Sequence, residues 1–569
     1  MTSIDPVTAA VIQGGLENIA IEMGHKLMRM SYSSIIRESE DFGAALTDAT
    51  GRQMCECKMS TPLQSGPIPG YVRNVLEVMA ARQDPIRPGD VIMHNDPYGG
   101  ASHGPDVAFC VPIFLHHELI GWSVTTAHHL DIGALSPGSC GIVDAVDTYA
   151  EGLQFKAIKV YDQGQKIQPV WHILRANIRA HELVVGDMEA QIESARIGSA
   201  RFLELVSING IGTIMAAFED LMNYSERLMR NAISALPDGD YSAKTYLDGF
   251  LDDPDFSRKN LPIVVTLKVR GDGLTVDLTG TAPQIPDKPI NMPLVGTVDC
   301  AVWLTIRSIL LDTVTYGSIP QNSGLTRPIK IIAPKGCLAN PIFPAPVIAR
   351  FCSGNQLADT VMKAFAQVVP RQVSAGIGNL RVVAISGLNE GKHWVHMEIM
   401  EGSYGGRFGI DGIDAVDTLY ANTRNNPIED IESHIPIRVD RYELREDAIA
   451  PGQWRGGIGA IREFTFLDNA AFSLEGDGHA FEPWGFDGGH DGHVATLTLV
   501  KKDLTEHPLP SKVPYFKVRA GDKLISSGPC GGGYGNPELR DHTSISNDIA
   551  DDLIGEDKAH RDYGWCAAP

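Results

Sequence analysis

The stretch from His94 to Asp131 constrains the fold more than any other part of the sequence, because it contains two apolar runs separated by a polar turn. Val107 to Leu115 and Leu119 to Thr126 have the length of strands, and the His-His-Glu sequence between them is typical of a turn. We therefore expect an antiparallel strand pair. Such a pair brings the residues before its first strand beside those after its second.

Residue types that bind metal ions are concentrated at the open end of this expected hairpin. His103 and Asp106 precede the first strand, and His128, His129 and Asp131 follow the second. Imidazole and carboxylate groups are the usual protein ligands of zinc, manganese and iron(II). Each histidine taken singly also has a structural interpretation, as a hydrogen-bonded or surface side chain. The spacing alone leaves both interpretations open.

Changes in composition and in the pattern of apolar residues divide the 569 residues into three regions. Residues 1–235 combine the hairpin with helices, the first of which is expected to begin at Asp5-Pro6. Residues 236–400 are richer in strand patterns, with a hairpin turn expected at Asp272-Gly273. Residues 401–569 are rich in glycine and end in a predicted helical tail. Hairpin signals outnumber strand–helix–strand alternations, so we predict an α+β fold with mostly antiparallel sheets.

The segment after the first helix contains two short apolar runs that we expect to be strands. These are Ile35-Ile36 and Phe42 to Leu46, and the sequence from Asp48 to Gly51 is typical of a hairpin turn. Charged residues lie between the two runs. They are either solvated or able to supply carboxylates to a site formed elsewhere in the chain.

Composition excludes several classes of function. The formal net charge of −22 and the absence of a basic run argue against a surface for nucleic acid or anionic membranes. No apolar run is long enough to span a bilayer, and the N-terminal sequence is not typical of a signal peptide. The nine scattered cysteines, including a predicted buried pair at Cys55 and Cys57, indicate a reduced, cytoplasmic protein.

The glycine-rich segments do not have the pattern of a nucleotide site. Residues 402–414, 455–460 and 530–537 lack the Gly-Lys-Ser/Thr of a phosphate-binding loop, and none opens a strand–helix unit. We interpret them as tight turns or close backbone contacts, and we predict that this chain alone does not bind ATP.

Six segments, spread over nearly the whole chain, resemble the hydantoinase B family. They are IRESEDFGAAL, NDPYGGASHGPDV, AHHLDIGALSPGS, NTRNNPIEDIE, RYELRED with WRGGIG, and GGGYGNPELRD. That family includes the second subunit of N-methylhydantoinases, the corresponding half of 5-oxoprolinases, caprolactamase, and subunits of acetone and acetophenone carboxylases.

The resemblance implies a division of labour within a hetero-oligomer. A hydantoinase A-type partner with an actin-like ATPase fold would bind ATP with magnesium and activate a small-molecule substrate with phosphate. This chain would hold a divalent ion (zinc, manganese or iron) and complete the hydrolysis of a cyclic amide, namely a hydantoin, oxoproline or lactam. One alternative is ATP-dependent carboxylation of a ketone. The other is a scaffolding subunit that has no catalytic role.

The resemblance also implies a set of metal ligands. The family's metal site carries over onto His103, Asp106 and His128, with a fourth carboxylate from the IRE segment. That carboxylate is Asp41 or, as the alternative, Glu38. A divalent ion held by two histidines and two carboxylates keeps open positions for water, which it would activate.

Two further matches and two departures complete the comparison with the family. His129 and Asp131 match the same HHxDIG run, and we expect them to support the ligands or to transfer protons. The chain has Gly133-Ala134 where Gly-Gly is common, and its loop 140–147 also departs from the usual sequence. Because this loop is expected to contact substrate, these departures leave the identity of the substrate open.

Overall fold

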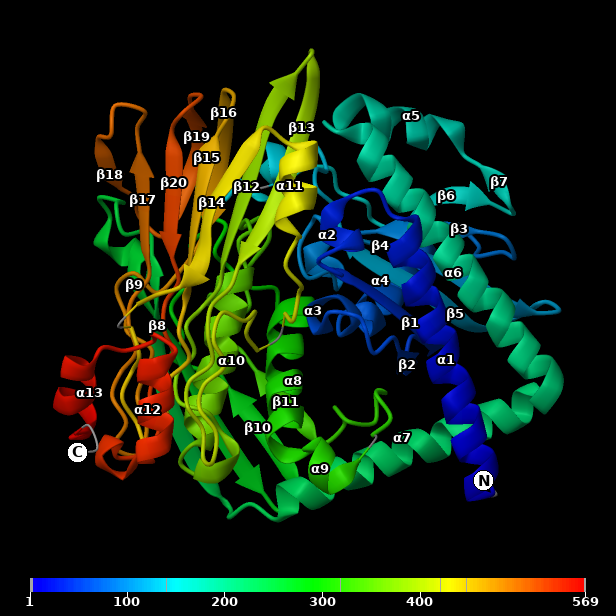
Figure 1. The fold of residues 1–569 in the computed structure, drawn as a ribbon. Helices are drawn as coiled ribbons and strands as arrows, with labels where there is room; N and C mark the ends of the chain where they lie inside the picture. Colours follow the sequence, from blue (N-terminus) through cyan, green and yellow to red (C-terminus); the bar gives the residue numbers. More distant parts are fainter. Residues whose placement is uncertain (1–3, 140, 318, 420, 447, 567–569) are drawn as a thin grey trace.

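The structure, a computed structural model, describes residues 4–139, 141–317, 319–419, 421–446 and 448–566. Figure 1 shows an N-terminal sheet crossed by long helices on one side of the molecule and a set of twisted C-terminal strands on the other. Helices and strands of the middle of the chain lie between and below them.

The first helices and the hairpin form the N-terminal part. The helices here are α1 (Pro6–Met30), α2 (Ser34–Arg37), α3 (Pro62–Ser65), α4 (Ile68–Arg82), α5 (Gln168–Asn177), α6 (His181–Asn209) and α7 (Ile211–Ser234). The seven-stranded sheet has the order β2 (Gln53–Glu56), β1 (Phe42–Asp48), β5 (Glu118–His128), β4 (Asp106–Leu115), β3 (Val91–His94), β6 (Ile158–Asp162) and β7 (Gln165–Lys166). Strands β4 and β5 pair antiparallel, so the hairpin prediction is confirmed.

This sheet is buried on both faces, and the alternation of side chains along β4 explains how. Val107, Phe109 and Val111 join the hydrophobic cluster that contains residues of α1 and α6. Ala108 and Cys110 point the other way and join a second cluster with residues of α4. Because successive strand residues face opposite sides, the smaller side chains lie on the face that α4 covers.

Three further sheets follow along the chain. The first has the order β11 (Ile329–Ile332), β10 (Gly273–Asp277), β9 (Lys259–Arg270) and β8 (Gly239–Gly249). The second has the order β13 (Lys392–Met400), β12 (Arg381–Asn389), β16 (Ala470–Glu475) and β19 (Lys512–Val518). The third has the order β14 (Ile437–Leu444), β15 (Ala460–Phe466), β20 (Lys523–Ser527), β17 (Thr496–Val500) and β18 (Glu506–Pro508).

Strand directions confirm the predicted fold class. Among the strand pairs of the described residues, β10 and β11 alone run parallel, and the others run antiparallel. The expected hairpin turn at Asp272-Gly273 joins β9 to β10. The remaining helices are α8 (Asp299–Leu310), α9 (Thr313–Tyr316), α10 (Phe351–Phe365), α11 (Ile428–His434), α12 (His542–Ala550) and α13 (Glu556–Tyr563).

The structure also corrects one local prediction. Ile35 and Ile36, which we expected in a strand, lie buried in the short helix α2. The cause is tertiary, because the carboxylate of Asp187 on α6 accepts hydrogen bonds from the backbone N–H groups of Tyr32 and Ser33 just before that helix. The run that begins at Phe42 is strand β1, as predicted.

The predictions for the start of the first helix and for the glycine-rich segments are confirmed. Asp5 caps α1 by accepting a hydrogen bond from the backbone N–H of Thr8. A Cβ atom added at Gly402 would lie 1.8 Å from the carbonyl oxygen of Gly378, so only glycine permits this close approach of two chain segments. The division of the chain into three regions stays a prediction.

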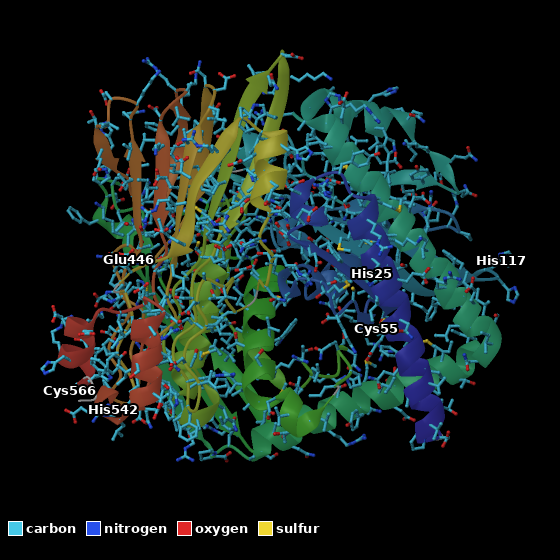
Figure 2. All side chains as sticks on the ribbon, in the orientation of Figure 1. His25, Cys55, His117, Glu446, His542 and Cys566 are labelled. Atoms are coloured by element: carbon cyan, nitrogen blue, oxygen red, sulfur yellow. The ribbon has the colours of Figure 1, made fainter. Side chains whose placement is uncertain are left out.

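Two other findings bear on composition. Cys55 and Cys57 are buried free thiols, whereas Cys566 is exposed near the C-terminus (Figure 2). Cys140, in the predicted substrate loop, lies outside the described residues. No single helix of the described chain is long and apolar enough to cross a membrane; α6 and α7 meet that criterion only as a pair, and they are bent by 104°.

Candidate metal centre

The register of the hairpin decides the location of the candidate site. Asp106, the first residue of β4, is paired directly with His128, the last residue of β5. The backbone N–H of His129 donates to the carbonyl of Pro105, which holds the loop before β4 against the end of β5. The hairpin therefore brings His103, Asp106 and His128 together across 25 residues of sequence.

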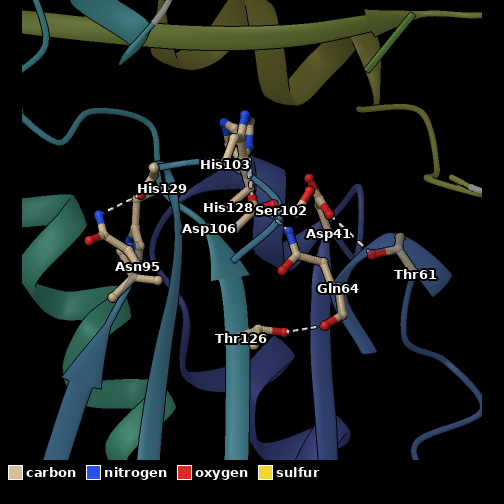
Figure 3. A network of polar contacts seen from close by, with 12 residues as sticks. Asp41, Thr61, Gln64, Asn95, Ser102, His103, Asp106, Thr126, His128 and His129 are labelled. Atoms are coloured by element: carbon tan, nitrogen blue, oxygen red, sulfur yellow. Dashed lines mark hydrogen bonds and ion pairs between the residues drawn. The ribbon is translucent and has the colours of Figure 1, made fainter. Parts of the chain in front are cut away.

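These three side chains are buried, and their donor atoms converge (Figure 3). His103 Nε2 lies 3.0 Å from Asp106 Oδ1 and 3.2 Å from His128 Nδ1, and His128 Nδ1 lies 3.1 Å from Asp106 Oδ1. Two ligands at zinc bond lengths of about 2.0–2.1 Å are roughly 3.3 Å apart around a tetrahedral ion. The observed spacing is close to that value.

The protonation of His103 supports the same interpretation. Burial, together with the nearby Arg350 guanidinium, lowers the pKa of His103 to about 4, so the ring is neutral near pH 7. Its Nδ1 donates to the carbonyl oxygen of Ile348 at 2.9 Å, which leaves a lone pair on Nε2. That lone pair faces a carboxylate oxygen at hydrogen-bond distance. Two acceptors at this distance need a cation or a proton between them.

Asp106 is the centre of the cluster. Besides the two histidines, its Oδ1 accepts a hydrogen bond from Gln64 Nε2 at 2.9 Å, and its Oδ2 pairs with Arg350 Nη2 at 2.9 Å. Burial by itself would raise the pKa of Asp106, but the hydrogen bonds that the carboxylate accepts and the charge of Arg350 hold it well below its usual value. The carboxylate is therefore ionised, as a metal ligand must be.

The two candidates for a fourth carboxylate lie in different surroundings. Asp41 lines the same small cavity as His103 and His128, and its Oδ1 accepts a hydrogen bond from Thr61 at 3.1 Å. It is not one of the residues whose donor atoms all lie within 4.8 Å of one another. Glu38 is paired with Arg37 at 2.8 Å and does not line the cavity. The geometry therefore favours Asp41.

His129, the residue after β5, is directed toward α6 and not toward the cluster. Its Nε2 lies 2.8 Å from Gln191 Oε1 on α6, and its buried Nδ1 has no hydrogen-bond partner among the described residues. Burial lowers its pKa to about 4, which keeps the ring neutral. Any contribution of His129 to proton transfer stays a prediction.

Asp131 also lies outside the cluster. Its carboxylate accepts hydrogen bonds from the backbone N–H of Arg179 at 2.7 Å and from the Arg179 guanidinium at 3.2 Å. Burial raises the pKa of Asp131, and the Arg179 interactions oppose that shift. These contacts tie the chain after β5 to the start of α6, and any role in proton transfer stays a prediction.

The cavity beside the cluster has a volume of only about 30 Å³. Its walls are mostly apolar and come from distant parts of the chain, including Leu63, Ile142, Phe351 and Met397. This volume is sufficient for one or two water molecules. A larger substrate would need the segments that carry these side chains to move apart.

Comparison with known proteins agrees with these observations. Residues 5–537 match the hydantoinase B/oxoprolinase family. The chain belongs to this family. It is 64% identical over 565 residues to a Pseudomonas protein (strain NS671) assigned to a D-/L-hydantoinase as one of its subunits, and the match covers 99% of this chain and 95% of that one.

Two solved structures have the same fold as this hydantoinase B family member. The crystal structure of ATP-dependent caprolactamase from Pseudomonas jessenii has a TM-score of 0.89 at 27% identity, and the match covers 99% of this chain and 96% of that one. Nucleotide-free acetone carboxylase also has a TM-score of 0.89, at 17% identity, with 98% and 79% covered. At this low identity, the match to acetone carboxylase shows a shared fold only.

Sequence reasoning missed several residues that support the cluster. Gln64 and Arg350 both contact Asp106. Glu151 accepts hydrogen bonds at 2.6 Å from the backbone N–H groups of Val347 and Ile348, and so fixes the loop whose carbonyl orients His103. The one signal in the sequence for Arg350 was its position immediately before the helix α10. No spacing rule connects any of these residues to the hairpin.

Proposed function

We propose that this chain is the metal-bearing subunit of an ATP-dependent enzyme that hydrolyses a phosphate-activated cyclic amide. The observation that carries the proposal is the convergence of His103, Asp106 and His128 to within 3.2 Å of one another inside the chain. Membership of the hydantoinase B/oxoprolinase family and the 64% identity to an assigned hydantoinase subunit support it.

The donor set suits a zinc, manganese or iron(II) ion. His103 would present Nε2, His128 Nδ1 and Asp106 Oδ1, with Asp41 as the fourth ligand. When bound, such an ion lowers the pKa of a bound water and polarises a carbonyl or phosphoryl oxygen.

The remaining residues of the site prepare this donor set. The Ile348 carbonyl fixes the tautomer of His103, and Gln64 and Arg350 fix the orientation of the Asp106 carboxylate. The apolar walls exclude bulk water, which strengthens each electrostatic interaction in the cavity. His129 is neutral, and its Nδ1 has no partner in the part of the chain that the structure describes. We assign it to proton transfer or to support of its neighbour His128.

A separate hydantoinase A-type subunit would bind ATP with magnesium and phosphorylate the substrate. The absence of a phosphate-binding loop motif in this sequence supports that assignment. The complex would be a cytoplasmic hetero-oligomer in which the activated substrate reaches the cavity beside His103.

The test is an assay of the complex reconstituted with an A-type partner, ATP and magnesium. We expect ring opening of a hydantoin, 5-oxoproline or caprolactam, and loss of turnover when divalent metal is removed by a chelator and only magnesium is restored. Turnover that is unchanged in the metal-stripped complex would contradict the proposal.

A ketone carboxylase subunit is the second candidate, because the acetone carboxylase chain has the same fold. The same complex, supplied with acetone or acetophenone and bicarbonate, would then consume ATP and form a carboxylated product. A scaffolding subunit, the third possibility, would bind no metal and would tolerate loss of His103.

A further inference from the structure

A second cavity lies on the other side of α3 from the candidate metal centre. It has a volume of about 300 Å³ and is bounded by residues of β2, α3, α4, α7, α8 and the segment 321–327. We call it the α8 pocket. It has no lining residue in common with the cavity beside His103. Cys300 Sγ lies 3.3 Å from the carbonyl oxygen of Pro62 and ties α8 to α3.

Three nitrogen donors at the α8 pocket are buried without a partner. They are Trp303 Nε1, Arg307 Nε and Asn322 Nδ2, and none has a hydrogen bond within the described part of the chain. Asn322 is only 5% exposed, and its Oδ1 accepts from the backbone N–H of Gly324 at 2.9 Å, which leaves Nδ2 unused. Buried donors are nearly always satisfied in native proteins, so three such donors on residues that line one cavity point to an acceptor bound there.

The charges around the α8 pocket favour an anion. Arg52 is paired with Asp48 and Glu219, and Arg327 with Glu226. The described ion pairs include neither Arg73 nor Arg307, although both line the pocket.

One acidic side chain, Glu56, also lines the α8 pocket and opposes this positive charge. It accepts a hydrogen bond from Gln53 Nε2 at 2.7 Å, and burial raises its pKa. Gln53 Oε1 is a further unpartnered atom there, and it is an acceptor. Glu56 also attracts Arg307 electrostatically. The pocket nevertheless has four arginines, Arg52, Arg73, Arg307 and Arg327, against this one carboxylate, and three unpartnered donors against one unpartnered acceptor among the described residues.

The rest of the wall is suited to an apolar group. Met229, Leu304, Leu325 and the Trp303 ring line the pocket beside Pro62 and Pro69. A volume of this size is at the lower end of the range for small-molecule sites. The combination of an apolar wall with arginine and N–H donors is typical of a site for a carboxylate or phosphate carried on a small organic group.

We propose that the α8 pocket binds a small organic oxyanion, with Arg307 and Arg73 pairing with its charge and the N–H groups of Trp303 and Asn322 donating to its oxygens. This site is separate from the candidate metal centre, and the inference does not depend on a bound metal. The helical turn α3 lies between the two sites, since Pro62 and Ser65 line the α8 pocket while Gln64 donates to Asp106.

The test is calorimetry of the full chain with benzoate, phenyl phosphate and inorganic phosphate, and with benzyl alcohol as the neutral control. We expect saturable binding of at least one aromatic anion and none of benzyl alcohol. The comparison of benzoate with phenyl phosphate identifies the preferred oxyanion, and inorganic phosphate shows how much the apolar body contributes.

Substitutions then locate the binding. Arg307→Met should weaken it at least ten-fold. Arg438→Met, which removes one charge from an exposed ion pair with Asp440 on β14, should leave it unchanged. Trp303→Phe keeps the ring and removes the N–H, so it should weaken binding about three-fold or more, and it serves as the second variant if Arg307→Met does not fold.

His103→Ala distinguishes the α8 pocket from the metal centre, because anion binding at the pocket should persist in that variant. Absence of saturable binding would overturn the inference. So would equal affinities in Trp303→Phe, Arg307→Met and Arg438→Met, or loss of binding in a folded His103→Ala protein. These outcomes leave the proposed hydrolase function untouched, since its test depends on metal and turnover.

Discussion

Replacement of His103 by alanine is the most direct test of the candidate metal centre. The ring is 5% exposed, and its Nδ1 donates to the carbonyl oxygen of Ile348. Loss of that bond leaves a buried carbonyl unsatisfied, at a cost of about 1–3 kcal/mol. Folded domains are typically stable by about 5–15 kcal/mol, so we expect the His103→Ala protein to fold with a modestly lowered melting temperature.

The effect on metal binding should be much larger. His103 Nε2 is one of three donor atoms within 3.2 Å of one another, so the substitution removes a third of the convergent set. Loss of a residue that only orients a ligand already weakens metal binding by about 10–100-fold. We therefore expect His103→Ala to weaken it by more than about 100-fold and to abolish turnover of the assembled complex.

The assay is equilibrium dialysis against zinc, manganese and iron(II), followed by elemental analysis, with circular dichroism as the check on folding. His117→Ala is the matched control, because His117 is exposed at the far tip of the same hairpin and projects into solvent (Figure 2). A folded His103→Ala protein that keeps full metal content and full activity would refute the reasoning and favour a scaffolding subunit.

Three further predictions come from contacts in and beside the candidate site, and one comes from the glycine-rich segments. Gln64→Ala should weaken metal binding about 10–100-fold in the dialysis assay, because it releases the Asp106 carboxylate. Asp41→Asn should lower turnover while Glu38→Gln should not, and equal effects would remove Asp41 from the ligand set. Isolated chain should give no heat with ATP in calorimetry; micromolar binding would contradict this. His129 has a pKa of about 4 when folded and 6.5 as its ordinary value, so the unfolded chain binds more protons between those pH values. The stability that depends on its neutral form is present above pH 6.5 and falls by up to about 3 kcal/mol as the pH drops to 4. Melting temperatures measured from pH 7 to pH 4 should fall less steeply for His129→Gln than for the unsubstituted protein. Parallel curves would contradict the assignment of this pH dependence to His129.

Local patterns in the sequence were sufficient for the elements that hold the candidate site. The apolar runs of β4 and β5 and the polar turn between them predicted the hairpin, and the hairpin register places Asp106 opposite His128. The capped start of α1 and the β9–β10 turn were predicted for the same reason. In each case the determining interactions lie within about 30 residues of sequence, where spacing and turn chemistry specify the geometry.

Tertiary structure alone decided which groups complete and control the site. Arg350 reaches Asp106 from 244 residues away, and Asp187 on α6 holds the backbone just before the helix that contains Ile35 and Ile36. His103 Nε2 carries a free lone pair because the carbonyl of Ile348, distant in the sequence, holds the ring proton on Nδ1. Such contacts form only when elements distant in the sequence pack together, and burial then determines the charge of each group. Residue type and spacing therefore cannot predict them.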